Sequence, residues 1–135
     1  MARRSLLTFI DALGVGIVPA RHHRYLIDKL EAVDRGDIRR LMVFMPPGSA
    51  KSTYASVLFP LWYLGRHPDR AIIHASHTTE LAERWGRRIR NMASEPRYGV
   101  LCPDMQLAVD SQAAGRWATQ AGGEYYAAGA GSAIV

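Results

Sequence analysis

The residues best suited to chemistry stand together in one run, Met45-Pro46-Pro47-Gly48-Ser49-Ala50-Lys51-Ser52-Thr53. The apolar residues 41–45 lead into this run, and a segment with helical spacing follows it from Ser52 to about Leu64. Loops that bind phosphate have this order of strand, tight turn, Lys-Ser and helix. The order suits an anion because backbone N–H groups at a helix N-terminus are free and the helix dipole favours negative charge there. The sequence therefore predicts a phosphate-binding loop.

Several residues of the run have a separate role in such a loop. Gly48, Ser49 and Ala50 are small, so the backbone can approach phosphate oxygens closely. Lys51 can reach the β and γ phosphates of a nucleotide, and the Ser52 hydroxyl can bind Mg²⁺. The candidate nucleotide-binding residues are therefore Pro47, Gly48, Ser49, Ala50, Lys51, Ser52 and Thr53, with Ser52 as the metal ligand.

The run departs from the usual pattern G-x-x-x-x-G-K-[ST] at two positions. That pattern would place glycine at Met45 and at Ala50. An alternative that needs no ligand is a Pro-Gly turn followed by a solvated lysine. The strand expected before the run and the helix expected after it favour the phosphate-binding loop.

Residues 46–53 resemble the variant Walker A loop of the large terminase subunit of tailed bacteriophages, in which Pro-Pro precedes the loop and a small residue can replace the last glycine. The resemblance covers most of the chain in the right order. It includes Arg21-His22-His23-Arg24, Ala75-Ser76-His77-Thr78, Gly122-Gly123-Glu124 and Gly129-Ala130-Gly131-Ser132. It implies a motor that uses ATP and Mg²⁺ to package double-stranded DNA into a procapsid.

The resemblance also implies a fold, an α/β P-loop NTPase of the ASCE type with a parallel sheet flanked by helices. Residues 1–36 would form an N-terminal helical segment, and residues 37–135 would form the front half of the ATPase domain. In this class, later strands insert between the strand at 41–45 and the strand at 71–75. We expect a fragment that ends before the Walker B strand and lacks the nuclease domain, with a sheet that is incomplete at the C-terminus.

The partners that the resemblance implies are double-stranded DNA, a small terminase subunit and a portal protein. The full-length protein would be a homo-oligomeric ring in the cytoplasm of a bacterial host, encoded by a phage or prophage. The family's upstream segment can help to hold adenine, which makes His22 and Arg24 candidates for the nucleotide pocket. The alternative for His22 and His23 is a surface or helix-capping role.

No catalytic carboxylate can be assigned from the sequence. An ATPase of this class needs an acidic residue at the end of an apolar strand to hold Mg²⁺, and a glutamate to orient the attacking water. Glu124 follows no apolar strand of four residues, so we assign it neither role. Whether this chain is itself an enzyme stays open. The alternatives are a non-enzymatic prophage remnant and another P-loop enzyme, such as a helicase-like NTPase or a small-molecule kinase.

A formal net charge of +5, from 17 basic and 12 acidic residues, is compatible with a polyanionic partner. One face of a helix expected after residue 78 carries arginines that could contact DNA phosphates: Arg84, Arg87, Arg88 and Arg90. The alternative is a solvated helix face. The composition, 48% hydrophobic and 21% charged, indicates a globular protein, and no stretch has the length of a membrane span.

Spacing and turn residues predict the other elements. Pro60 cannot donate a hydrogen bond to Ser56, so the helix after the loop should be kinked or locally broken. Cys102 is the single cysteine and should be a buried or incidental thiol. We expect helices at 5–13, at 20–33 and from Thr78 or Thr79 to before Pro96, strands at 41–45 and 71–75, a weak loop-like region at 98–112, and a hairpin from 117–119 to 124–128.

Overall fold

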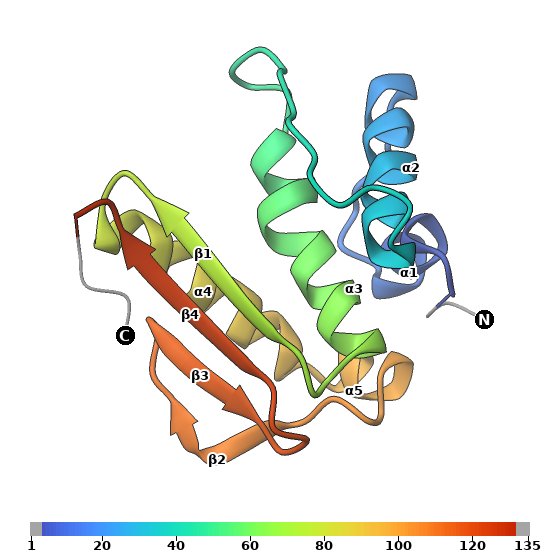
Figure 1. Cartoon of the computed structure of the whole chain (residues 1–135). Helices are drawn as coiled ribbons and strands as arrows, with labels where there is room; N and C mark the ends of the chain where they lie inside the picture. Colours follow the sequence, from blue (N-terminus) through green and yellow to red (C-terminus); the bar gives the residue numbers. More distant parts are fainter. Residues whose placement is uncertain (1–3, 132–135) are drawn as a thin grey trace.

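The computed structural model describes residues 4–131 and shows a mixed α/β chain (Figure 1). The elements in order are α1 (Leu6–Leu13), α2 (Arg21–Arg35), η2 (Thr53–Leu58), α3 (Phe59–Arg66), β1 (Ala71–Ser76), α4 (Thr79–Ala93), α5 (Pro96–Leu101), β2 (Leu107–Gln112), β3 (Arg116–Thr119) and β4 (Glu124–Gly129). Most of the predicted helices, the strand at 71–75 and the hairpin are therefore confirmed. The helices that precede the loop lie to one side of the sheet in Figure 1.

The sheet is mixed, with strand order β1-β4-β3-β2. β1 and β4 are parallel, and their register runs from Ala71 opposite Glu124 to Ser76 opposite Gly129. β3 and β4 form the predicted antiparallel hairpin, and β2 pairs antiparallel to β3. The expectation of a parallel sheet is therefore correct only for β1 and β4, because a connection as short as that between β3 and β4 can only join antiparallel strands.

Helix α4 covers one face of this sheet (Figure 1). It begins after the predicted cap Thr78, whose Oγ1 accepts a hydrogen bond from the Leu81 N–H at 3.1 Å. The Trp117 ring stacks on the Tyr125 ring, with 5.0 Å between centroids, and its indole N–H donates to the Gly86 carbonyl at 3.2 Å. The helix can come this close because Gly86 has no side chain. A Cβ there would lie 2.7 Å from the Ala114 carbonyl oxygen.

The N-terminal helices are joined to the rest of the core by buried aromatic side chains. Phe9 of α1 meets the edge of Tyr98 in α5, with 6.1 Å between ring centroids. The Tyr98 hydroxyl donates to the Leu61 carbonyl at 2.7 Å, and both side chains are fully buried. Tyr98 therefore links α1, α3 and α5.

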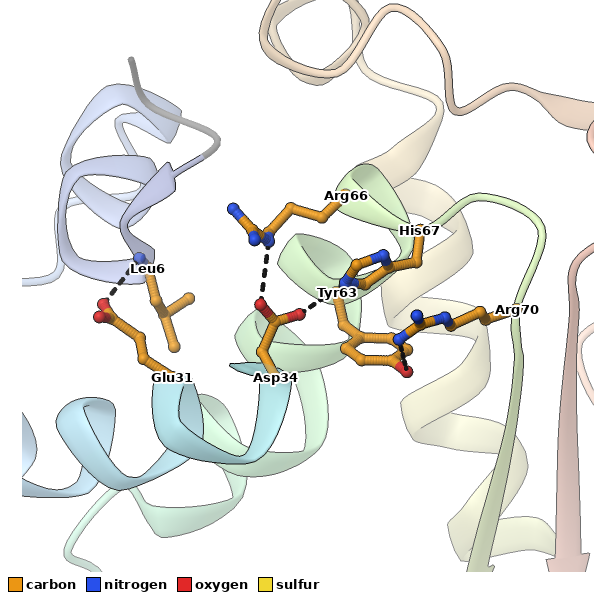
Figure 2. Close-up of polar contacts among 7 residues, drawn as sticks. All are labelled: Leu6, Glu31, Asp34, Tyr63, Arg66, His67 and Arg70. Atoms are coloured by element: carbon orange, nitrogen blue, oxygen red, sulfur yellow. Dashed lines mark hydrogen bonds and ion pairs between the residues drawn. The ribbon is translucent and has the colours of Figure 1, made fainter. Parts of the chain in front are cut away.

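A buried carboxylate fixes α2 against α3 (Figure 2). The Asp34 side chain is only 2% exposed and pairs with Arg66 Nε at 3.1 Å and with His67 Nε2 at 2.9 Å. In the same region, Glu31 accepts a hydrogen bond from the Leu6 N–H at 3.0 Å and so ties α1 to α2. The end of α2 is therefore fixed against the end of α3.

The helix after the loop accommodates Pro60 without breaking. Residues 53–58 are π-helical, and the Phe59 N–H donates to the Tyr54 carbonyl five residues earlier. A π-helical turn shifts the hydrogen-bond pattern at the point where Pro60 has no N–H to give. The predicted local break thus takes the form of a π-helical segment inside a helix that runs over residues 51–66.

The predicted strand at 41–45 is wrong, because these residues are extended but unpaired. Met42 is 78% exposed and Phe44 is 84% exposed, while Leu41, Val43 and Met45 are half-buried. Within residues 4–131 no strand lies beside this segment. A strand is defined by its hydrogen-bonded neighbour, so an alternating apolar segment without one remains extended coil.

The loop-like prediction for residues 98–112 is correct only for residues 102–106, because α5 and β2 lie on either side of them. Pro96 occupies the first turn of α5, a position where its missing N–H costs nothing, and Tyr98 and Cys102 behind it are fully buried. β2 forms the outer strand of the sheet. Both elements have six residues, too few for a periodic pattern to stand out from the surrounding sequence.

Candidate phosphate-binding site

The loop begins with a tight turn over residues 46–49. The Ser49 N–H donates to the Pro46 carbonyl at 3.3 Å, and Gly48 has a φ of +80°. Proline at the second position and glycine with positive φ at the third are typical of a type II turn. Pro47 and Gly48 therefore have a conformational role, which turns the chain back toward the helix.

The next residue, Ala50, also has a left-handed backbone, with a φ of +62°. It occupies the position at which the usual loop pattern has its second glycine, and the left-handed conformation explains that preference. A residue with a Cβ loses roughly 1–2 kcal/mol there. The Ala50 carbonyl accepts the first helical hydrogen bond from the Tyr54 N–H at 3.3 Å, so the helix starts directly after this residue.

The loop surrounds a hollow at the helix N-terminus. Its volume is about 430 Å³ and it is lined by residues 45–53. This size falls within the roughly 300–1,000 Å³ of small-molecule sites. The first amides of a helix have no carbonyl partner within the helix, which leaves those of Lys51, Ser52 and Thr53 available to an anion.

Charge in the hollow comes from Lys51. Its side chain is half-buried, and it takes part in no ion pair among residues 4–131. Ser52 and Thr53 are half-buried beside it at the start of the helix. The Ser49 Oγ is buried and has no hydrogen-bond partner within the described part of the chain. A buried hydroxyl without a partner, a free ammonium group and helix amides are a donor set that suits phosphate.

The histidine that contacts the loop is His23. Its helix-capping role is confirmed, since its Nδ1 accepts from the Ala20 N–H at 3.1 Å, but its contact with the loop was not predicted. Its Nε2 lies 2.7 Å from the Ser49 carbonyl oxygen, and its ring stacks on Tyr54 with 4.6 Å between centroids. The signal that could have identified it is its place at the third helical position after Ala20, from which a side chain reaches back to the start of a helix.

The two upstream candidates lie around His23 rather than on the loop. The His22 side chain is exposed, with its ring 4.0 Å from that of His23. Arg24 is exposed and lines a hollow with Leu7 and Asp11 of α1. A role for His22 and Arg24 in holding a nucleotide base therefore stays a prediction.

The four arginines proposed for DNA do not share one environment. Arg84, Arg87 and Arg88 are exposed on α4. Arg90 is half-buried and donates to the Gln112 carbonyl of β2 at 2.6 Å. The side chains of residues 84, 87 and 88 can meet an external phosphate backbone together, whereas Arg90 already binds the sheet.

A groove runs along the unpaired edge of β1. It has a volume of about 800 Å³ and is lined by residues 71–75, by side chains of η2 and α3 including Phe59 and Tyr63, and by Arg39. β1 pairs with β4 on its other side, and Ile73 is 61% exposed. Burial in this region lowers the pKa of His74, which lines the groove and lies 3.0 Å from the Tyr125 hydroxyl.

Neither parallel strand ends in a carboxylate. β1 ends at Ser76 and β4 ends at Gly129, while Glu124 at the start of β4 pairs with Arg116. Within residues 4–131 no group of three His, Cys, Asp or Glu side chains could hold a metal ion. The role of the Ser52 hydroxyl as a metal ligand stays a prediction.

The glycines near the C-terminus have two different roles. Gly129 packs against the start of α4, where a Cβ would lie 2.3 Å from the Thr79 nitrogen. Gly131 has a φ of +85° and lies in a turn, and Ser132 falls outside the described residues. Gly129 is thus a close-packing residue at the end of β4.

Comparison with known proteins finds no matching family model, no similar curated protein and no similar solved structure. The functional argument therefore depends on the loop and on the residues around it. None of the described helices combines the length and apolar character needed to cross a membrane.

Proposed function

We propose that the chain binds the phosphate groups of ATP, together with Mg²⁺, in the loop at residues 46–53. The observation that carries this proposal is the hollow at the helix N-terminus, lined by the loop and supplied with charge by Lys51. A turn followed by a solvated lysine would need neither the left-handed Ala50 nor the buried Ser49 hydroxyl. Both features cost stability in the free protein, and an anion in the hollow would offset that cost.

The roles of the residues follow from their positions. Amides at the start of the helix would donate to phosphate oxygens, and Lys51 would neutralise charge on the β and γ phosphates. Ser52 would supply one oxygen ligand to Mg²⁺. Bound Mg²⁺ supplies further charge neutralisation on the same phosphates.

We further propose that the chain is the nucleotide-binding part of a terminase large subunit, a motor that packages double-stranded DNA. The groove beside β1 supports this proposal because the resemblance implies additional strands at this place, between the segment at 41–45 and β1. The groove is lined by β1 and by Arg39, which lies just before that segment. The P-loop fold of the ASCE type, the oligomeric ring, the small terminase subunit, the portal protein and the bacterial cytoplasm belong to the same proposal.

Mutation of Lys51 tests the nucleotide site. Lys51→Ala is expected to lower the affinity of the chain for Mg-ATP by about 10- to 100-fold, the effect of losing charge-assisted hydrogen bonds. Ser52→Ala should chiefly reduce the dependence of binding on Mg²⁺, because one hard oxygen ligand is lost. Titration calorimetry with ATP, with and without Mg²⁺, measures both effects.

The matched control for this experiment is Lys29→Ala. Lys29 is the other lysine of the chain and lies on α2 over the Tyr25 ring, 5.2 Å from its centroid. The Lys29→Ala substitution should leave the affinity for Mg-ATP unchanged. Equal binding by the wild-type chain and the Lys51 variant would refute the phosphate-binding proposal.

The DNA part of the proposal predicts a steep dependence of affinity on salt. If Arg84, Arg87 and Arg88 contact phosphates, the slope of log affinity against log salt should include about −0.9 for each contact. Arg87→Glu combined with Arg88→Glu should remove about two contacts and lower affinity for all DNA sequences alike. Fluorescence anisotropy with labelled duplexes at several salt concentrations measures the slope.

Reversal of Arg39 and Arg40 to Glu is the charge-matched control, since both are exposed and lie away from α4 in the sequence. An equal loss of affinity in both double variants would show an effect of net charge alone. In that case the arginine face of α4 would be a solvated surface.

A further inference from the structure

We propose that His23 positions the phosphate loop: its neutral ring, with the proton on Nε2, holds the Ser49 carbonyl and thereby sets the loop in its anion-binding shape. This inference deepens the phosphate-binding function proposed above and rests on it for the affinity part of its test. It assigns a role to a residue on α2 that lies 26 positions before Ser49 in the sequence.

Two contacts determine which ring nitrogen carries the proton. The Ala20 N–H donates to His23 Nδ1 at 3.1 Å, so this nitrogen must be unprotonated. The Ser49 carbonyl oxygen, 2.7 Å from Nε2, can only accept, so Nε2 carries the proton. A second proton on Nδ1 would point at the Ala20 N–H and displace the ring. The contact with the loop therefore needs one tautomer of the neutral imidazole.

The ring is also held from the side of the loop helix. It stacks on Tyr54 with an angle of 28° between the ring planes, and the Tyr54 side chain is only 1% exposed. Since α2 is fixed against α3 through Asp34, the ring reaches Ser49 from a rigid support (Figure 2).

The hydrogen bond to Ser49 matters because it fixes a peptide plane in the loop. A trans peptide places the carbonyl of one residue and the N–H of the next on opposite sides. With the Ser49 carbonyl held by His23, the Ala50 N–H must point away from that ring. Ala50 is the residue with a φ of +62°, which few side-chain-bearing residues adopt without support. His23 thus helps to maintain the left-handed conformation of Ala50, after which the helix begins with its free amides directed at the anion site.

The tautomer can be observed directly. Nitrogen-15 spectra of the imidazole rings in the 135-residue chain should show His23 with a protonated Nε2 and an unprotonated Nδ1 at neutral pH. A ring protonated on Nδ1, or a random-coil spectrum for residues 20–58, would overturn the inference. This measurement needs no ligand, so it is independent of the proposed function.

Three substitutions separate the two contacts of the ring. His23→Ala removes both, and His23→Asn keeps an acceptor near the Ala20 N–H but cannot reach Ser49. His23→Gln can reach the Ser49 carbonyl with an N–H donor. We expect the Ala and Asn variants to bind Mg-ATP about three- to tenfold more weakly, the range for one lost hydrogen bond, and the Gln variant to recover most of the affinity. Amide exchange at Ala50 and Lys51 should follow the same order.

The control is His77→Asn, at an exposed histidine between β1 and α4, which should change neither affinity nor exchange. If the wild-type chain binds Mg-ATP and His23→Ala binds equally well with unchanged loop exchange, the inference is wrong and the proposed function stands. If the wild-type chain does not bind Mg-ATP, the proposed function fails, and the imidazole spectrum and the exchange rates alone decide the role of His23.

Discussion

The 135-residue chain is expected to bind Mg-ATP weakly and to release no phosphate from it. Weak binding can persist because the phosphate loop is continuous in sequence and complete in the structure. Turnover needs a carboxylate that holds Mg²⁺ at the end of a strand and a glutamate that orients water. β1 and β4 end in Ser76 and Gly129, and Glu124 is engaged with Arg116. Phosphate release should therefore equal that of Lys51→Ala under the same conditions.

The same chain should melt over a broad temperature range. The loop with its flanking helices and the sheet with α4 are joined mainly through contacts of the loop helix with α4 and of α1 with α5. The apolar side chains of Met42, Phe44 and Ile73 gain little from folding because they remain exposed. Cooperativity between the two parts is then weak, and the typical stability of about 5–15 kcal/mol for a domain should not be reached.

Calorimetry and a phosphate-release assay check both halves of this prediction. A sharp melting transition, together with sustained hydrolysis that disappears in Lys51→Ala, would contradict it. That outcome would mean that carboxylates already present in the chain perform the catalytic roles. Asp104 and Asp110 would then be the first candidates for substitution by asparagine, since they lie between α5 and the end of β2.

Gly86→Ala is expected to push α4 away from the sheet and to destabilise the fold. The new Cβ would lie 2.7 Å from the Ala114 carbonyl oxygen and 2.8 Å from Tyr125 Cε1, so α4 must move away from β4. Overpacking of this kind costs about 1–3 kcal/mol, and the gain in helix propensity of roughly 1 kcal/mol offsets only part of it. The separation should break the hydrogen bond from the Trp117 indole to the Gly86 carbonyl. Near-ultraviolet circular dichroism and exchange of the Trp117 indole proton report the change.

Gly99→Ala is the matched control for the Gly86 variant. Gly99 lies in α5, and a Cβ there would have no neighbour within 4 Å. This substitution should leave the Trp117 signals unchanged and stabilise α5 slightly through helix propensity. Equal behaviour of the two alanine variants would show that α4 does not depend on close approach at Gly86.

Local signals were enough to predict much of this fold. Thr78 caps α4 through a hydrogen bond within one turn, and Gly122 and Gly123 mark the turn between β3 and β4. The loop after Pro46 could likewise be predicted, because its turn and its helix start depend on neighbouring residues. These features rest on interactions across a few positions, which a single sequence shows directly.

The features that could not be predicted depend on distant partners. The segment at 41–45 has the composition of a strand, but only a neighbour in space could make it one. The contact of His23 with Ser49 was not predicted because it spans 26 positions and the neighbours of His23 in the sequence have similar chemistry. Pro60 signalled a disturbance in the helix, but the form of that disturbance depends on how the chain repacks around it.

The π-helical segment before Pro60 also sets the angular phase of the helix. A π-helical turn contains about one residue more than an α-helical turn, and one residue corresponds to about 100° of rotation. Arg66 and His67 therefore leave the helix about 100° away from where an uninterrupted α-helix would direct them, and in this orientation they meet Asp34. The number of residues between Lys51 and Arg66 thus determines the direction in which the loop faces relative to α2. A single insertion or deletion within that stretch would turn the loop away from His23, although no residue of the loop or of α2 would be changed.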